Sequence, residues 1–141
     1  MPTFPLEIIT PERIAYQEQV EMVVVPGSDG YMGILPHHIS LFSLLTEGEI
    51  KIKKENEDYF LSIGGGFVEV TQEKVRILVT KALHAHELNE QEILQAKERA
   101  EKILKEKPVG EDLEAAVQLL RSSLVDLRVL GRRKYRSTPV A

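Results

Sequence analysis

The first part of the chain alternates between apolar and polar residues in short runs. Within Gly48–Lys54, isoleucines alternate with lysines, and within residues 74–81, Val75 and Ile77 are followed by a further valine two positions on. A period of two is typical of a strand with one buried face. Such runs, separated by turn residues across residues 6–82, predict a sandwich or barrel of antiparallel strands. Residues 74–81 are predicted to form its last strand.

The composition changes after His86, where Ala, Glu, Lys, Gln and Leu replace the β-branched residues. These residue types favour helix. Asn89 can cap a first turn, Glu92 stands three positions later to complete a capping box, and Leu88 can pack on Ile93. The sequence therefore predicts that a helix begins here.

A second helix is predicted after the Pro-Val-Gly break at residues 108–110. Its apolar residues recur at spacings of three and four, at Leu113, Val117, Leu120, Leu124 and Leu127. Two amphipathic helices joined by so short a connection are expected to lie antiparallel, with alanines allowing close approach. The predicted fold class is α+β, with an N-terminal antiparallel β-sandwich over residues 1–86 and a C-terminal two-helix antiparallel hairpin over residues 87–141.

Two glycine-rich segments interrupt the strand-like runs. Residues 26–38 read Pro-Gly-Ser-Asp-Gly-Tyr-Met-Gly-Ile-Leu-Pro-His-His, and their glycines at Gly27, Gly30 and Gly33 permit the positive φ angles that the turns of a shaped loop need. Residues 64–66 are three glycines, but neither a helix nor a Gly-Lys-Ser/Thr ending follows them. We therefore expect a bulge or close backbone packing there, and not a phosphate loop.

Composition and charge exclude several classes of protein. The net charge of −4 gives no basic surface for nucleic acid, and the absence of cysteine excludes disulfides and thiolate chemistry. The N-terminus lacks the basic and apolar regions of a signal or transit peptide. No apolar run approaches the roughly 20 residues of a spanning helix, so membrane association is expected through another protein and without direct insertion.

Charge is distributed unevenly between the two predicted parts. Residues 1–86 carry seven basic and twelve acidic side chains, whereas residues 111–141 carry six basic and four acidic ones. The sandwich and the end of the hairpin are therefore expected to meet different partners.

Candidate chemistry is sparse. His84 and His86 would point to the same side of an extended segment and could hold a metal, although the further ligands of a cupin-type site are missing downstream. His37 and His38 would point to opposite faces of a strand and could not easily share an ion. Since no nucleophile, base and oxyanion donors come together, we predict no catalytic residues, no metal and no cofactor.

The order and spacing of these segments resemble the epsilon subunit of rotary F-type ATP synthases. The resemblance rests on residues 6–11, 25–38, 48–50 and 65–70 and on the two helices that follow. It implies a non-catalytic, central-stalk subunit of a proton-translocating enzyme, whose sandwich binds the gamma subunit and stands on the membrane rotor ring. The family's ring-facing loop matches residues 28–33, which implies interface roles for Ser28, Tyr31 and Gly33, and the position matching His38 faces gamma.

The resemblance also implies that the hairpin regulates the enzyme. In bacterial members it either folds against the sandwich or extends into the catalytic head and inhibits ATP hydrolysis. A basic helix with Arg121, Arg128, Arg132 and Arg133 would then meet carboxylates of the beta and alpha subunits. Residues 88–93 read Leu-Asn-Glu-Gln-Glu-Ile and depart from the family's ATP-binding motif, which has aspartate at the second position and arginine at the fifth. Because glutamate replaces that arginine, we predict weak or absent ATP binding.

The missing transit peptide and the long hairpin favour a bacterial protein, peripheral on the cytoplasmic face of the cell membrane. Two alternatives come from other classes of protein. One is a metal-dependent β-sandwich enzyme that uses His84 and His86, and the other is an interaction module whose hairpin forms a dimeric coiled coil.

Overall fold

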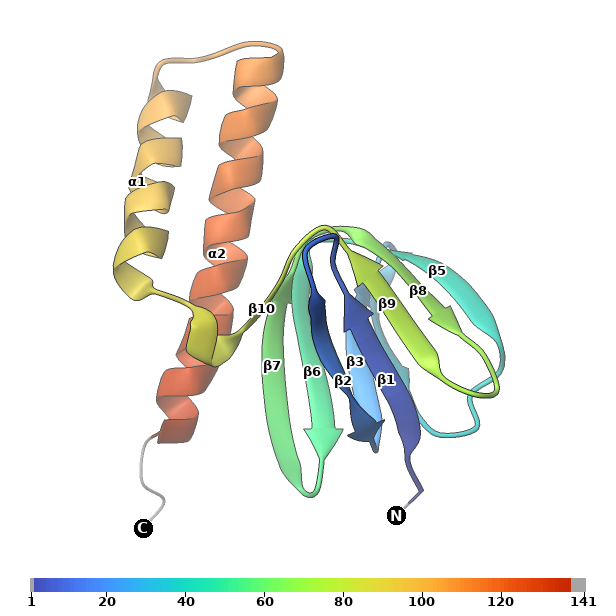
Figure 1. Cartoon of the computed structure of the whole chain (residues 1–141). Helices are drawn as coiled ribbons and strands as arrows, with labels where there is room; N and C mark the ends of the chain where they lie inside the picture. The colour runs from blue at the N-terminus through green and yellow to red at the C-terminus, as the bar shows by residue number, and fades with distance from the viewer. Residues whose placement is uncertain (1, 138–141) are drawn as a thin grey trace.

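The computed structural model describes residues 2–137 and the side chains of residues 2–132. It contains a β-sandwich beside a helical hairpin that rises from one edge of it (Figure 1). The strands are β1 (Phe4–Ile9), β2 (Ile14–Val20), β3 (Met22–Gly27), β4 (Gly30–Ile34), β5 (Leu41–Leu45), β6 (Gly48–Lys54), β7 (Glu57–Ile63), β8 (Gly66–Val70), β9 (Val75–Val79) and β10 (Ala82–His84). The predicted fold class is confirmed.

The strands form one continuous hydrogen-bonded path in the order β10-β7-β6-β3-β5-β8-β9-β1-β2, with β4 paired to β3. The path folds over at β3, which pairs with β6 in one layer and with β5 in the other. Its pairs are antiparallel with one exception, because β1 and β9 run parallel. The prediction of a wholly antiparallel sandwich is wrong at that pair, which is made by strands far apart in sequence.

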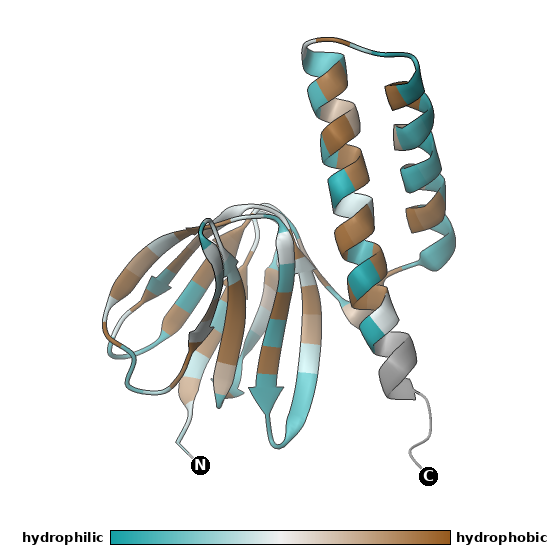
Figure 2. Cartoon of the chain, turned by 180° about the vertical axis from the view of Figure 1, so that it is seen from behind, coloured by the Kyte–Doolittle hydropathy of each residue, from teal (hydrophilic) through white to brown (hydrophobic). Residues whose placement is uncertain are grey.

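The alternation read from the sequence matches the buried face of the sheet. Ile50, Ile52 and Ile77 are fully buried, whereas the lysines and arginine between them lie at the surface. Figure 2 shows the same alternation as apolar and polar bands along the strands. The two layers therefore meet through a continuous apolar core, which is the main source of stability of the sandwich.

The predicted last strand is followed by another. After β9, residues Ala82–His84 form β10, which pairs antiparallel with the end of β7. A strand of three residues is too short to show a period, so the prediction that residues 74–81 end the sheet is wrong. β10 leads through a 3-10 turn, η1 (Ala85–Glu87), into the hairpin.

The hairpin consists of α1 (Glu90–Lys105) and α2 (Glu111–Ser137), which lie antiparallel (Figure 1). The predicted start of α1 is confirmed, because the side chain of Asn89 accepts a hydrogen bond from the backbone of Glu92 at 3.1 Å. Leu88 and Ile93 are buried in one cluster, as a hydrophobic staple requires. Close approach of the helices is also confirmed, since Ala100 and Ala116 are among the most buried residues of the hairpin.

The predicted leucine stripe of α2 is only partly its buried face. Leu113 and Leu124 are 40% and 44% exposed, whereas Val129 and Leu130 are buried. The reason is that α2 has two sets of partners, because it packs on α1 and also contacts β6, β7 and η1. A single stripe cannot describe a helix with two partners on different sides.

The glycine predictions have mixed outcomes. Gly30 has a φ of 129° after the Ser-Asp turn between β3 and β4, but Gly27 and Gly33 lack a positive φ, and the next left-handed residue is His37, with φ 65°. At Gly66, an added Cβ would overlap the backbone carbonyl of Leu78. Close backbone packing is therefore confirmed for the second glycine segment.

Candidate functional site

The later part of α2 is held to the sandwich by a buried carboxylate. Asp126 is 8% exposed and accepts a hydrogen bond from the hydroxyl of Ser62 on β7, which is also buried. The Lys81 ammonium lies 3.1 and 3.2 Å from the two carboxylate oxygens and 3.0 Å from the Ser122 hydroxyl. We call these four residues the Asp126 cluster. Both donors to the carboxylate, Ser62 and Lys81, belong to the sandwich, whereas Asp126 lies on α2, so these hydrogen bonds form only while the hairpin is docked.

A second contact lies nearly two turns further along α2. The guanidinium of Arg132 donates to both carboxylate oxygens of Glu49 on β6, at 3.2 and 3.3 Å, and sits 5.2 Å from the ring centre of Phe60 on β7. Hydrogen bonding to Glu49 raises the pKa of Arg132 further. We call Glu49 and Phe60 the Glu49 site. It forms one end of a cleft of about 640 Å³ that Tyr31 also lines.

A more exposed contact supplements these two. The Gln118 side chain on α2 donates to Glu47 at 2.8 Å, just before β6 begins. Burial raises the pKa of Glu47, and the nearby positive charges of Lys81 and Arg121 oppose that rise. These polar contacts lie beside an apolar cluster in which Val129 and Leu130 of α2 are buried with Leu88 and Ile93, against Phe60 of β7 and Leu83 of β10.

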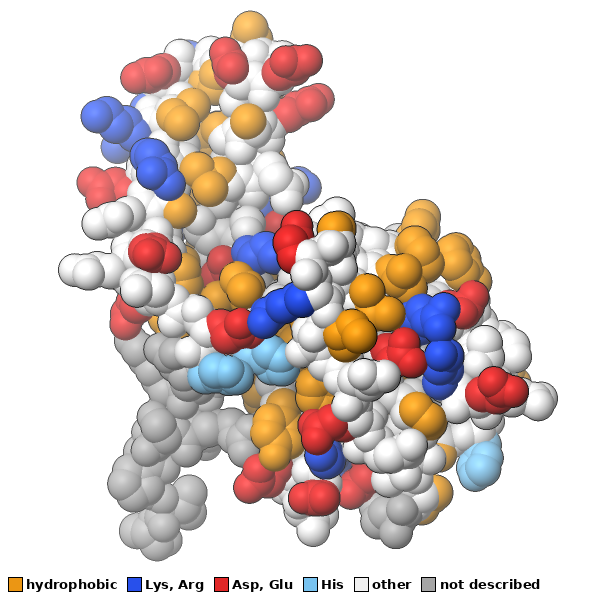
Figure 3. Space-filling view, viewed as in Figure 1, with side chains coloured by type: hydrophobic (Ala, Val, Ile, Leu, Met, Phe, Trp, Pro, Cys, Tyr) orange, Lys and Arg blue, Asp and Glu red, His pale blue; other side chains and the backbone are white. Residues whose placement is uncertain are grey.

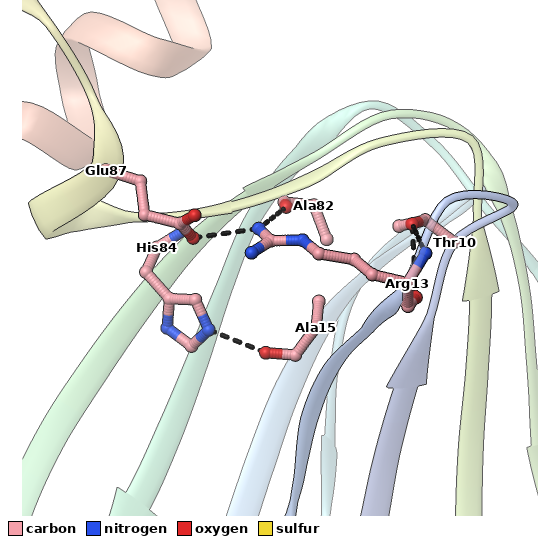
Figure 4. Close-up of polar contacts among 6 residues, drawn as sticks. All are labelled: Thr10, Arg13, Ala15, Ala82, His84 and Glu87. Carbon is pink, nitrogen blue, oxygen red and sulfur yellow. Dashed lines mark hydrogen bonds and ion pairs between the residues drawn. The ribbon is translucent and has the colours of Figure 1, made fainter.

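Side-chain contacts at the base of the hairpin connect the start of β2 to β10 and η1 (Figure 4). We call the residues that make them, Arg13, Ala15, Ala82, His84 and Glu87, the root clamp. Arg13 donates to the backbone carbonyl of Ala82 at 2.9 Å and to the Glu87 carboxylate at 2.8 Å. Nε2 of His84, on β10, donates to the backbone carbonyl of Ala15, on β2, at 2.7 Å. The hydrogen bond from the Arg13 guanidinium to the Glu87 carboxylate lowers the pKa of Glu87.

The root clamp gives His84 a structural partner. The rings of His84 and His86 stack with their centres 5.2 Å apart, and the Nε2 atom of His84 is engaged by Ala15. Within residues 2–132, no group of three or more histidine, cysteine, aspartate or glutamate side chains could hold a metal ion. The arrangement at His84 therefore joins two strands.

The predicted interface residues lie before, on and after strand β4. Ser28 is exposed in the turn before β4, and Tyr31 and Gly33, on β4 itself, are exposed too, Tyr31 by 56%. His38 follows β4 in the next loop, where its Nδ1 lies 2.8 Å from the carbonyl of Ile39. A strand separates Ser28 from His38, so these residues do not form one site.

A broad apolar surface was missed by the sequence analysis. Phe42 and Leu44 of β5 are 61% and 63% exposed, and the ring of Phe42 lies 5.0 Å from that of Phe67. Leu44, Phe67 and Leu78 are successive partners across β5, β8 and β9, and we call these four residues the β5 face. Figure 3 shows hydrophobic side chains gathered on this side of the sandwich. The signal was the run Leu-Phe-Ser-Leu-Leu at residues 41–45, which is apolar on both faces.

The predicted basic residues are also in different surroundings. Arg121 and Arg128 are exposed on α2, whereas Arg132 occupies the Glu49 site. Arg133 belongs to α2, but its side chain lies outside the described residues. Sequence reasoning found Arg132 from its charge and missed Glu49 and Asp126, because their partners are distant in sequence.

Comparisons with known proteins agree on one family. Residues 3–85 match the family model described as ATP synthase, Delta/Epsilon chain, beta-sandwich domain. An ATP synthase epsilon chain from Dehalococcoides mccartyi is 39% identical over 135 residues, which cover 95% of this chain and 96% of that relative. An ATP synthase epsilon chain from Moorella thermoacetica is 36% identical over 132 residues, which cover 93% of this chain and 98% of that one.

A solved structure has the same fold. A chain in the mitochondrial ATP synthase of Euglena gracilis, in an assembly of OSCP, F1 and c-ring, superposes with a TM-score of 0.67 at 19% identity, covering 96% of this chain and 82% of its own. Among the described helices, none is long and apolar enough to cross a membrane.

Proposed function

Because this chain belongs to the ATP synthase delta/epsilon family as an epsilon chain, a non-catalytic subunit of the F-type enzyme, we propose that it couples the rotor ring to gamma and inhibits ATP hydrolysis through its hairpin. In this proposal, residues 1–86 form the gamma- and ring-binding domain, and residues 87–141 form the regulatory one. The enzyme is proton-translocating, and the subunit is peripheral on the cytoplasmic face of the bacterial cell membrane. Recovery of alpha, beta and gamma subunits with a tagged chain purified from its own membranes would support this assembly; a chain recovered alone would contradict it.

The proposed gamma contact is supported by the β5 face and the neighbouring loop. Exposed apolar surface on a folded domain marks a place where another protein packs. Leu35 and Ile39 lie with His38 in the loop that leads into β5. They are 56% and 79% exposed and add further apolar surface there. The substitution Leu44→Glu is expected to reduce retention on the gamma-containing complex. Leu94→Glu is the matched control, since Leu94 is 45% exposed on α1, outside the sandwich. Equal retention of the two variants would contradict the contact.

The proposed ring contact is supported by the turn between β3 and β4. This turn is short, exposed at Ser28 and held by strand pairing up to Gly27 and Gly30. A rigid turn loses little conformational entropy when it docks, which suits a contact that transmits torque. Tyr31 and Gly33 lie on the strand that leaves it.

The proposed regulation is supported above all by the polar contacts of Asp126 and Arg132, which hold α2 to the sandwich beside the apolar cluster around Val129 and Leu130. Such polar contacts can exchange their partners for water or for charges on another subunit, whereas the buried core of the sandwich cannot. The exposed Arg121 and Arg128 are available for carboxylates of the beta and alpha subunits, each exposed pair being worth about 0–1 kcal/mol.

Truncation after Pro108 tests the regulatory role, because it removes α2 and leaves the sandwich intact. We expect ATP hydrolysis by the assembled complex to rise. Complexes reconstituted with the full chain serve as the control, and subunit content is checked in both. Unchanged hydrolysis in a fully assembled truncated complex would contradict inhibition by the hairpin.

Weak or absent ATP binding remains part of the proposal. The side-chain oxygen of Asn89 is used as the cap of α1, and Glu90 and Glu92 place negative charge in the first turn. Both features oppose the binding of a polyphosphate. Calorimetric titration of the full chain with ATP is expected to give little heat, and tight binding would contradict the prediction.

A further inference from the structure

The Glu49 site has the geometry of a receptor for a guanidinium group. Its carboxylate accepts two hydrogen bonds from one side chain, at Nε and Nη2 of Arg132, and its aromatic ring stacks beneath the same group. Arginine alone among the basic side chains combines a planar donor fork with a face that stacks on an aromatic ring. The two walls come from adjacent strands, β6 and β7, so the sheet fixes their separation.

The buried carboxylate of the Glu49 site also requires a nearby cation. The Glu49 side chain is 9% exposed, and a carboxylate so far removed from water requires a compensating partner. Within the described part of the chain, the ion pair found for Glu49 is the one with Arg132, while the nearby Lys51 pairs with Asp58 at 3.8 Å. Arg132 itself remains half exposed, and its departure with α2 opens the smaller cluster around Val129 and Leu130 and not the separate core of the sandwich.

While the Arg132 guanidinium donates two hydrogen bonds to Glu49 and lies over Phe60, these two N–H groups cannot bind another carboxylate. We propose that the Glu49 site competes with acidic groups of the catalytic head for Arg132, so that docking of the hairpin and the inhibitory contact exclude each other at this residue. The inference rests on the proposed inhibition by the hairpin and names the residue that is exchanged. It distinguishes Arg132 from Arg121 and Arg128, which are exposed while the hairpin is docked.

This exclusion makes a prediction that a simple structural role does not. Removing Glu49 frees Arg132 for the inhibitory contact, whereas removing Arg132 abolishes both its docked and its inhibitory contacts. The two substitutions should therefore affect docking in the same direction and hydrolysis in opposite directions.

Docking is measured on the full chain alone. The chain has no cysteine, so exposed positions such as Gln17 on β2 and Lys102 on α1 can be changed to cysteine and spin-labelled to follow the distance between sandwich and hairpin. We expect Glu49→Gln and Arg132→Ala each to lower the docked fraction. Glu55→Gln is the matched control, an exposed carboxylate in the turn between the same two strands, and should leave it unchanged. A docked fraction of wild-type size in Glu49→Gln would overturn the inference.

Hydrolysis is measured on the assembled complex with the same variants. We expect Glu49→Gln to lower the rate about twofold or more and Arg132→Ala to raise it by a similar factor, as a modest population shift would do. Changes of the same sign in both variants would overturn the exclusion. If the docked fraction shifts as expected but truncation after Pro108 leaves hydrolysis unchanged, the proposed regulatory function fails while the docking role of the Glu49 site stands.

Discussion

The sandwich and the hairpin are stabilised by different kinds of contact. The sandwich encloses a core in which Leu6, Ile50 and Ile77 are completely removed from water. The hairpin packs through small residues such as Ala100 and Ala116, and it meets the sandwich through charged groups and a smaller apolar cluster around Val129 and Leu130. Burial of apolar area is strong and has no alternative partner in water, whereas ion pairs at a surface can be exchanged. One chain thus combines a body with a fixed shape and an arm whose attachment is conditional.

The largest effect is expected at Gly66, where the sandwich leaves no room for a side chain. Gly66→Ala would drive a methyl group into the carbonyl of Leu78 on the paired strand, and we expect a loss of about 3 kcal/mol or more in the free energy of unfolding. Gly131→Ala is the control on α2, where a Cβ has nothing within 4 Å and alanine favours helix by about 1 kcal/mol. Chemical denaturation measures both variants. Similar losses of unfolding free energy in Gly66→Ala and Gly131→Ala would contradict the proposed difference in packing between the sandwich and the hairpin.

A smaller and more local effect is expected at the Asp126 cluster. Asp126→Ala removes the acceptor of Ser62 and Lys81 and should weaken docking by about 1–3 kcal/mol without touching the apolar core. Hydrogen exchange should show faster exchange in α2 and unchanged protection in the strands of the sandwich. Glu114→Ala, at an exposed position of the same helix, serves as the control. Equal loss of protection in both bodies would mean that they unfold as one unit.

The cap of α1 tests the hairpin by itself. Asn89→Ala removes the side-chain oxygen that accepts from the Glu92 amide, and the expected cost is about 1 kcal/mol. Exchange at the first turn of α1 should quicken, because its amide hydrogens lose an acceptor. Gln91→Ala changes an exposed residue of the same turn and should leave exchange nearly unaltered. A cap variant that behaves like this control would show that packing alone positions the helix.

The smallest effect concerns pH at the root clamp. Since Arg13 lowers the pKa of Glu87 in the folded chain, the stabilisation is present above the unfolded pKa and is lost as pH falls through the lowered folded value. Carboxyl NMR titration is expected to give a higher midpoint for Glu87 in Arg13→Ala than in the unaltered chain. Lys102→Ala, on the exposed side of α1, should leave the midpoint in place. An unchanged midpoint in Arg13→Ala would show that the guanidinium does not hold this carboxylate.

Sequence reasoning succeeded where the structure is determined by neighbours in the chain. The alternation at Ile50 and Ile77 predicted strands, and Asn89 predicted the start of a helix, because in each case the periodicity or the cap lies within a few residues. It failed for the parallel pairing of β1 with β9 and for the short β10, since both depend on segments brought together by the fold.

The docking interface escaped prediction for the same reason. Asp126 lies 64 residues from Ser62 in sequence, and Arg132 lies 83 residues from Glu49. The basic residues of α2 could be recognised as a cluster, but nothing local indicates which of them meets the sandwich. The buried carboxylates of Glu49 and Asp126 look in the sequence like ordinary surface charges.

The root clamp also changes what the two edge strands offer to another chain. β2 and β10 end the hydrogen-bonded path of strands, and the edge of a sheet is a template on which another chain can add a strand. Here the Ala15 carbonyl is already occupied by His84, and the Ala82 carbonyl by Arg13. These contacts therefore occupy one backbone carbonyl on each edge strand, so that part of each edge is already paired and cannot accept a hydrogen bond from a strand of another chain.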